Sequence, residues 1–196
     1  PFTSSIIKLK FEERGINHEG YLNTIDLSSE IKINPFELKF QTLTHSIPEP
    51  NSIFIKTKLG TIYHTGDWKI DLDPVVGETI DLDSLKSNSK EILAMICDST
   101  NVLTKGRSGS ESEVKGNLIN LIKHQKNRVF VTSFASNVAR LETIAAAAKE
   151  SKRSLVVLGR SMHRMISVAR QNGILAEIDI ILSEKEILSK LEALNK

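Results

Sequence analysis

The stretch LTHSIPEPNSIFIKTKLGTIYHTGDWKID, residues 43–71, decides how the first half of the chain folds. Two runs rich in β-branched and aromatic residues flank Gly60, a pattern typical of a β-hairpin with its turn at the glycine. The strand-like run that enters the stretch closes on His45, and the last run closes on Asp67. Both residue types bind metal ions, so the stretch predicts two neighbouring strands and raises the question of a metal site at their ends.

Two candidate ligands are too few for a catalytic metal site. A catalytic zinc ion normally has three protein ligands, and a two-metal hydrolytic site holds its ions about 3.5–4 Å apart. His45 and Asp67 fit one imidazole ligand and one bridging carboxylate, and the alternative that they bind no metal stays open. The remaining histidines form no His-x-His pair and are expected to be solvated or to pack: His18, His64, His124 and His163.

The composition is that of an ordinary globular protein. The 196 residues are 40% hydrophobic and 26% charged, and the formal charge of +2 tolerates a polyanionic partner without requiring one. Cys97 is the only cysteine, so no internal disulfide can form and a reducing, cytoplasmic compartment is expected. No apolar run approaches the roughly 18 residues of a membrane span, so no membrane segment is expected. No signal peptide is expected either, and Pro1 at the start suggests a chain that begins inside a larger fold.

Two patterns divide the chain near residue 90. The first part contains hairpin-like runs, including an alternating run at 37–45, after a helix expected at 1–14. From residue 91 onward strands and helices alternate, which is typical of a parallel sheet covered by helices. The strands expected there are 91–98, 128–134, 154–159 and 177–183, and the expected helices are 108–126, 136–151, 161–173 and 184–196.

Small polar residues follow the expected strands of the second part, in the segments ICDSTN, VTSFASN and VLGRSM. Ligands of α/β proteins gather at the carboxyl ends of strands, and the first turn of a helix offers free N–H groups that suit phosphate. Arg160 adds a planar guanidinium that matches phosphate oxygens. Serine and asparagine also cap helices without any ligand, so capping stays an alternative for each loop.

Six motifs occur in an order and spacing that resemble the ribonuclease J family. They are PFTSSIIKLKFEERG, THSIPE, GTIYHTGDWKID, CDSTN, VTSFASN and LGRSM, between Pro1 and about Gly173. That family belongs to the β-CASP nuclease branch of the metallo-β-lactamase superfamily. Each motif is weak alone, but the ordered set is specific, and a generic nucleotide-binding α/β domain is the least favoured alternative.

The resemblance implies roles for individual residues. His45 matches the third metal-binding motif, and Asp67 matches the fourth, whose carboxylate bridges two metal ions. Asp98 matches the acidic residue that opens the β-CASP insertion and supports a downstream catalytic histidine. The residues implied to face RNA phosphates are Ser136, Asn137, Arg160 and Ser161. The implied enzyme is a hydrolase that cleaves RNA as an endonuclease and as a 5′-to-3′ exonuclease, with water activated on zinc or manganese.

The sequence departs from the family pattern in several places. The His-x-His-x-Asp-His motif, which carries most of the metal ligands, does not occur in the 196 residues, and neither do the late histidine motifs of the β-CASP domain. Ala139 stands where the family often has histidine, Glu49 where it usually has aspartate, and Trp68 where it usually has phenylalanine. No close match follows about residue 182. We therefore expect an internal piece of a ribonuclease J that is inactive alone.

These observations predict an α/β fold in which the hairpin-rich half of a metallo-β-lactamase αββα fold is joined to a β-CASP-like parallel sheet. The predicted domains are residues 1–104 and 105–196. The predicted partner is RNA, with a complementing chain or a homo-oligomer supplying the missing ligands; the alternative is a non-catalytic remnant that binds RNA weakly. Without preceding strands, the faces around Ile53, Ile55 and Ile62 are expected to lose cover and to promote association.

Overall fold

The computed structural model describes residues 1–175, 180–181 and 186–188. The chain divides into two compact units, Pro1–Ser110 and Glu111–Lys196, and each is described by itself. The division falls a few residues after the boundary predicted between residues 104 and 105, which stays a prediction about family domains. No helix among the described residues has the length and apolar character needed to cross a membrane.

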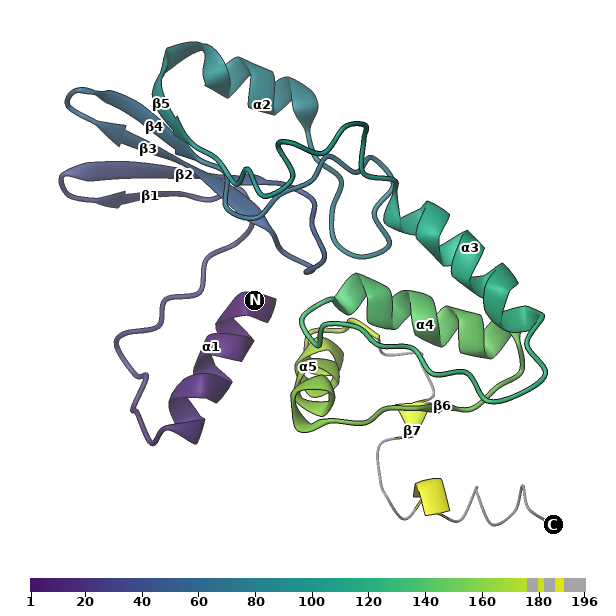
Figure 1. Ribbon diagram of the computed structural model, residues 1–196. Helices are drawn as coiled ribbons and strands as arrows, with labels where there is room; N and C mark the ends of the chain where they lie inside the picture. The colour runs from purple at the N-terminus through teal and green to yellow at the C-terminus, as the bar shows by residue number, and fades with distance from the viewer. Residues whose placement is uncertain (176–179, 182–185, 189–196) are drawn as a thin grey trace. The chain divides into compact units, whose positions relative to one another are not determined.

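The first unit is built around a five-stranded, mostly antiparallel sheet in the order β1-β2-β3-β4-β5 (Figure 1). Its strands are β1 (Glu30–Ile33), β2 (Phe36–Thr42), β3 (Asn51–Thr57), β4 (Gly60–His64) and β5 (Ile92–Ile96). β1 to β4 form an antiparallel meander, and β5 joins β4 in parallel after a crossover through α2 (Leu82–Asn88) and the short turn η1 (Ser89–Glu91). Helix α1 (Phe2–Glu13) precedes the sheet, and the backbone N–H of Phe2 donates to the Glu49 carboxylate (2.8 Å) beyond β2.

The hairpin of β3 and β4 forms from the two β-rich runs that predicted it. Thr57 pairs with Gly60 across a two-residue turn, so Gly60 begins β4 instead of occupying the turn itself. Gly60 has a φ of +146°, and a Cβ at this position would lie 3.1 Å from the Leu93 Cβ in β5. Glycine is therefore required where β5 lies against the start of β4.

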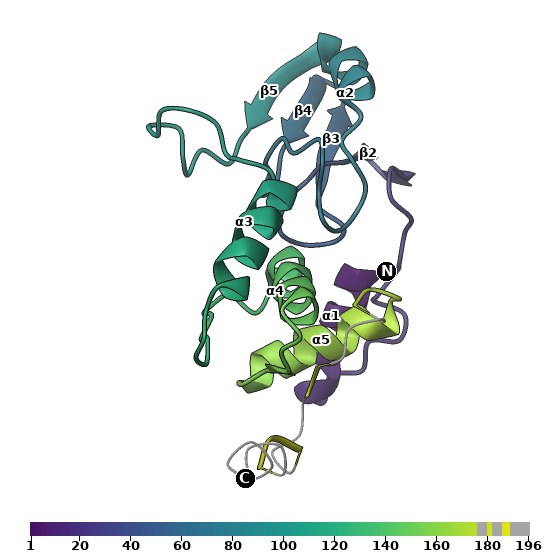
Figure 2. The same cartoon turned by 90° about the vertical axis from the view of Figure 1, so that its right-hand side faces the viewer.

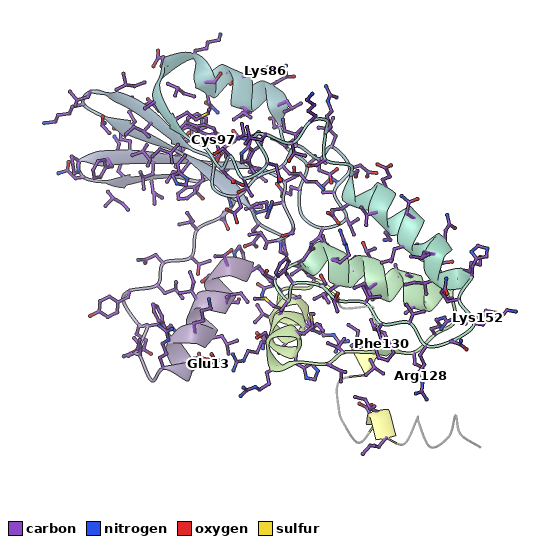
Figure 3. The ribbon with its side chains drawn as sticks, viewed as in Figure 1. Glu13, Lys86, Cys97, Arg128, Phe130 and Lys152 are labelled. Carbon is purple, nitrogen blue, oxygen red and sulfur yellow. The ribbon has the colours of Figure 1, made fainter. Side chains whose placement is uncertain are left out.

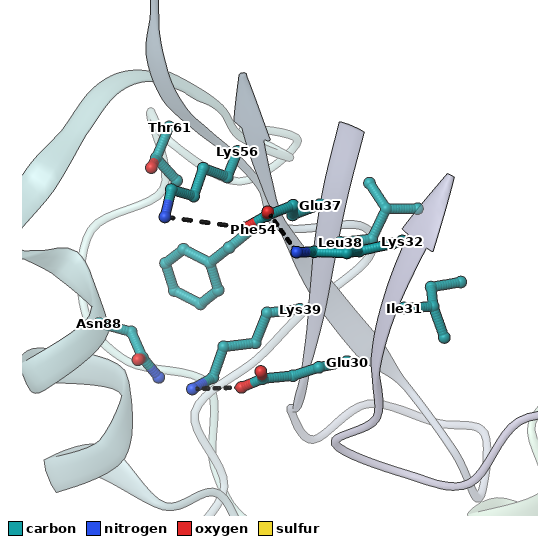
Figure 4. Close-up of a pocket in the computed structure, with 10 residues that line it drawn as sticks. All are labelled: Glu30, Ile31, Lys32, Glu37, Leu38, Lys39, Phe54, Lys56, Thr61 and Asn88. Carbon is teal, nitrogen blue, oxygen red and sulfur yellow. Dashed lines mark ion pairs between the residues drawn. The ribbon is translucent and has the colours of Figure 1, made fainter. Parts of the chain in front are cut away.

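Side chains alternate between two faces of this sheet because successive residues of a strand point to opposite sides. One face is polar, and charged pairs cross β1, β2 and β3 around the buried Phe54, as the close-up in Figure 4 shows. The pairs join Lys32 to Glu37 (2.8 Å), Lys39 to Glu30 (2.9 Å) and Lys56 to Glu37 (3.7 Å). Helix α2 adjoins this face, because Ser84 and Asn88 both donate to the side-chain oxygen of Gln41 in β2.

The opposite face of the sheet is apolar. Its residues are in register across four strands, because Ile31 pairs with Leu38, Leu38 with Ile55, and Ile55 with Ile62. The half-buried side chains of this face are Ile31, Leu38, Phe40, Ile53, Ile55 and Ile62. The three isoleucines that the sequence predicted to lose cover therefore lie on a face that is only partly shielded from solvent.

Within the described residues, the second unit combines helices (Figure 2) with one pair of short strands (Figure 1). Its elements are α3 (Glu111–Lys123), α4 (Val138–Glu150), β6 (Leu155–Val156), α5 (Arg160–Gln171) and β7 (Ile180–Ile181). Helix α3 packs along α4, and α4 carries most of the buried side chains of this unit, many of them alanine. β6 and β7 pair in parallel.

The parallel sheet predicted for this unit is reduced, among the described residues, to the two-residue pairing of β6 with β7. The predicted strand at 128–134 is wrong, because this segment has no strand pairing in the described structure, and Phe130 (Figure 3) and Phe134 are 87% and 84% exposed. Its apolar residues match a strand pattern, but a strand needs a neighbour that supplies hydrogen-bond partners. Most of the predicted strand 177–183 and helix 184–196 lies outside the described residues.

Candidate functional site

The candidate site lies where three strands of the first unit end on the same edge of the sheet. β2 and β4 both run antiparallel to β3, and β5 runs parallel to β4, so all three strands end on one side. His45 follows the end of β2 by three residues, Asp67 follows β4 by three, and Asp98 follows β5 by two. The topology therefore brings the three candidate residues of this unit to one edge, at carboxyl ends of strands where ligands commonly bind.

The segments that follow β2 and β4 are joined at Thr44. Thr44 forms an isolated β-bridge with Lys69, whose backbone N–H donates to the Thr44 carbonyl (2.9 Å). The Thr44 hydroxyl accepts a hydrogen bond from the backbone N–H of Asp71 (3.0 Å). Asp71 is buried, and its carboxylate pairs with the Lys69 ammonium (3.2 Å). These contacts hold the turn that carries Asp67 against the residue that precedes His45.

The segments that follow β4 and β5 are joined through the backbone of Asp98. The N–H of Asp98 donates to the Thr65 hydroxyl (3.0 Å), and its carbonyl accepts from the indole N–H of Trp68 (3.1 Å). The backbone N–H of Thr65 also donates to the Ile96 carbonyl (3.0 Å). Asp67 lies between Thr65 and Trp68 in the sequence, so residues on both sides of it are hydrogen-bonded to the segment that follows β5.

Hydrogen bonds from Thr100 lower the pKa of the Asp98 carboxyl. Its Oδ1 accepts hydrogen bonds from the Thr100 hydroxyl (2.6 Å) and the Thr100 backbone N–H (3.0 Å). The hydroxyl, then the backbone N–H, and to a lesser degree the charge of His45 lower the pKa of Asp98, while partial desolvation opposes them. Asp98 is therefore negatively charged at neutral pH and stays charged to more acidic pH than an ordinary aspartate.

His45 and Asp67 both present atoms that a ligand can reach. His45 is half-buried, and its Nδ1 lies 3.3 Å from the Ser46 hydroxyl, which points to Nε2 as the nitrogen for a ligand. Asp67 is exposed, and in the described part of the chain its carboxylate makes no hydrogen bond or ion pair. An imidazole nitrogen and a carboxylate are donor types that suit zinc or manganese.

The donor types fit a metal ion, but their number does not complete a site. Across residues 1–175, 180–181 and 186–188, no three His, Cys, Asp or Glu side chains are grouped to hold an ion. A catalytic zinc ion normally has three protein ligands. His45 and Asp67 would therefore hold an ion only together with ligands from elsewhere.

The residues predicted to face RNA phosphates lie at the starts of two helices of the second unit. The side-chain oxygen of Asn137 caps α4 by accepting from the backbone N–H of Arg140 (2.8 Å), as the capping alternative predicts. Arg160 and Ser161 begin α5, are exposed, and follow a residue that provides no side-chain cap. Ser136 is also exposed.

Sequence reasoning missed the residues that hold the candidate site together: Thr44, Thr65, Trp68 and Thr100. The only signal in the sequence is their closeness to a candidate residue within the motifs THSIPE, HTGDW and CDST. The hydrogen bonds of the first three span 27 to 33 positions of sequence. Only strand order and register create such contacts, so no local pattern predicts them.

Comparison with known proteins identifies the family. Residues 126–195 match the family described as Ribonuclease J, beta-CASP domain. Ribonuclease J of Sinorhizobium meliloti is 38% identical over 187 residues, which cover 95% of this chain and 33% of that protein. Ribonuclease J of Thermus thermophilus is 33% identical over 189 residues, which cover 94% of this chain and 33% of that protein. The chain belongs to the ribonuclease J family.

This member of the ribonuclease J family spans about a third of the length of the curated relatives it matches. Ribonuclease J2 of Bacillus subtilis is 29% identical over 187 residues, covering 94% of this chain and 34% of that protein. A solved structure from Enterococcus faecalis V583, of a protein of unknown function, superposes with a TM-score of 0.62 at 17% identity and covers 93% of this chain and 44% of that one. The family resemblance of the motifs is thus confirmed, and the structural likeness concerns the fold alone. The limit set near residue 182 is wrong, because the family match continues to residue 195.

Proposed function

We propose that this ribonuclease J-type chain contributes His45, Asp67 and Asp98 to a metal-dependent site that hydrolyses RNA, and that the chain alone does not cleave RNA. One observation carries the proposal: the three residues follow β2, β4 and β5 at a single edge of the sheet. The position of each residue in its family motif supports the same assignment.

Each of the three residues has a distinct role in this proposal. His45 offers Nε2 as a metal ligand, and Asp67 offers an exposed carboxylate that can bridge two ions. Asp98 is ionised at neutral pH, hydrogen bonds from Thr100 lower its pKa further, and its charge stabilises a positively charged neighbour such as a protonated imidazole. Zinc or manganese, if bound by these residues, would lower the pKa of a water that could act as the nucleophile.

The second unit is proposed to bind the phosphates of the RNA. The guanidinium of Arg160 matches phosphate oxygens, and Ser136 and Ser161 add exposed hydroxyl donors. Asn137 uses its side-chain oxygen to cap α4, which leaves its NH₂ group as a donor. The substrate is proposed to be cytoplasmic RNA, cleaved internally and from the 5′ end.

The incomplete ligand set supports inactivity of the chain alone. The His-x-His-x-Asp-His motif does not occur in the sequence, and the described residues contain no group of three ligands. Ligands from outside these 196 residues would have to supply the rest. The same observation favours a second candidate function, which is RNA binding without cleavage.

The test is cleavage of a 5′-monophosphorylated RNA in Mn²⁺ or Zn²⁺ by the purified chain, alone and mixed with a polypeptide that carries the His-x-His-x-Asp-His region of a relative. We expect no cleavage by the chain alone and cleavage by the mixture. Asp67→Ala should abolish the restored activity, whereas Asp83→Ala, which removes an exposed acid in α2, should leave it unchanged.

Two outcomes would contradict the proposal. Cleavage by the chain alone that Asp67→Ala abolishes would show that self-association completes the site. No cleavage by the mixture, together with RNA binding by the chain, would favour the non-catalytic function.

A further inference from the structure

We propose that Trp68 is a positioning residue that fixes the loop carrying Asp98 against the turn carrying Asp67. Its significance for RNA hydrolysis rests on the proposed function, but the contact itself does not. The indole N–H of Trp68 donates to the Asp98 carbonyl over 3.1 Å. The two residues are 30 positions apart and follow different strands, β4 and β5, so this bond joins two separate loops.

The indole N–H is the stronger of two side-chain donors at the Asp98 carbonyl. Tryptophan has one polar atom, which can only donate, and an indole N–H that is partly buried usually finds a partner. The other donor is the thiol of Cys97, labelled in Figure 3, at 3.3 Å. A thiol is a weak donor, so loss of the indole N–H would leave this carbonyl poorly satisfied.

Trp68 acts together with Thr65, which holds the other polar group of the same peptide segment. The N–H of Asp98 donates to the hydroxyl of Thr65 (3.0 Å), and Thr65 is buried. The N–H and the carbonyl of Asp98 are therefore both attached to one short turn. Two attachments fix the direction in which the Asp98 side chain leaves the backbone, whereas one attachment would allow rotation about it.

This two-point attachment uses no atom of either carboxylate. Asp67 lies between the two attaching residues, and its carboxylate makes no bond in the described part of the chain. Asp98 engages Thr100 through Oδ1 only. Trp68 therefore sets where the two acids lie relative to each other while leaving both available to a ligand, which is the task of a supporting residue around a site.

The chain contains a single tryptophan, so replacing all tryptophan by an analogue changes only this position. Benzothienylalanine keeps the shape of the ring and replaces the N–H by sulfur, and 4-fluorotryptophan keeps the N–H as the matched control. The measurement is hydrogen exchange of the Asp98 backbone amide by NMR, with neither RNA nor metal present. We expect exchange roughly three- to tenfold faster with benzothienylalanine, the factor that loss of one net hydrogen bond gives, and native exchange with fluorotryptophan.

The exchange rates with the two analogues show whether Trp68 positions Asp98 through its N–H or only fills space with its ring. If Trp68 only fills space, both analogues should give native exchange, because both keep the ring, and that result would overturn the proposal. An indole N–H that exchanges as fast as that of free tryptophan would overturn it as well. Trp68→Phe should reproduce the benzothienylalanine result, with faster exchange confined to the loops after β4 and β5. Since the measurement needs no RNA, failure of the complementation experiment would leave it unaffected.

Discussion

At the scale of single residues, one threonine lowers the pKa of Asp98. The Thr100 hydroxyl and backbone N–H both donate to Oδ1 and lower the pKa of this carboxyl. Thr100→Val removes the hydroxyl and keeps the N–H, so we expect the pKa of Asp98 to rise toward the ordinary value of about 3.9. A ¹³C NMR titration of the Asp98 carboxyl carbon measures the change.

The same substitution should alter how stability depends on acid. Because Asp98 has a lower pKa in the folded chain than in the unfolded chain, its ionisation stabilises the fold above about pH 4, and this contribution is lost as the pH falls through the folded-state pKa. In urea unfolding measured at several pH values, the free energy of unfolding of Thr100→Val should fall less on acidification than that of the native chain. Thr104→Val, at an exposed position of the same loop, is the control. If the Asp98 carboxyl titrates with the same midpoint pH in both variants, the role of Thr100 is contradicted.

The candidate residues could be predicted at this scale, but their supports could not. His45 and Asp67 each follow an apolar or alternating run, so a polar side chain at a strand end marks them, whereas the family resemblance singled out Asp98. Trp68 looks like a mild change from phenylalanine in the sequence. Its importance depends on an N–H bond to a carbonyl 30 positions away, which only the pairing of β4 with β5 brings within reach.

At the scale of elements, substitutions of Asn137, which caps α4, can test the stability of the helix separately from the proposed RNA binding. Asn137 accepts a hydrogen bond from the Arg140 backbone N–H, so Asn137→Ala should lower the free energy of unfolding by about 1 kcal/mol. Asn137→Ser keeps a capping oxygen and removes the amide. If the amide contacts phosphate, Asn137→Ser should weaken RNA binding in a filter-binding assay without the loss of stability that Asn137→Ala shows in urea. Unchanged RNA binding by Asn137→Ser would remove Asn137 from the proposed RNA contacts.

Elements whose formation depends on residues close in sequence were predicted well, whereas strands that need a distant neighbouring strand were not. The hairpin of β3 and β4 follows from two β-rich runs around a glycine. Helix α3 follows from an amphipathic run with glutamates in its first turn, and α5 from a helical run that Gly173 ends. The segment 128–134 has the same apolar character as β5. It lacks strand pairing in the described structure, whereas β5 pairs with β4, and composition alone does not reveal which apolar run has a neighbour.

At the scale of the whole molecule, exposed apolar surface on the first unit should promote self-association. The apolar face of the sheet is only half-buried, and Leu93, Met95 and Ile96 of the edge strand β5 are 66%, 60% and 54% exposed. The other edge strand, β1, carries Glu30 and Lys32, which discourage strand addition. We expect the purified chain to bind a hydrophobic dye and to sediment as a concentration-dependent mixture of species.

A charge placed on the apolar face should reduce both the binding of hydrophobic dye and the self-association of the chain. Ile55→Lys puts an ammonium in the middle of this face, whereas Ser87→Lys adds the same charge at an exposed position of α2 and serves as the control. We expect less dye fluorescence and a shift toward monomer for Ile55→Lys only. A native chain that stays monomeric at all concentrations and binds no dye would contradict this expectation.

The most direct test of a metal site at the ends of β2, β4 and β5 is a Mn²⁺ titration followed by NMR, because bound Mn²⁺ broadens the signals of nearby nuclei. We predict that, in the chain mixed with the polypeptide that carries the His-x-His-x-Asp-His region, broadening centres on His45, Asp67 and Asp98, and that Asp67→Ala greatly weakens it while Asp83→Ala does not. Broadening that is absent, that centres elsewhere, or that persists in Asp67→Ala would contradict a metal site built on these three residues.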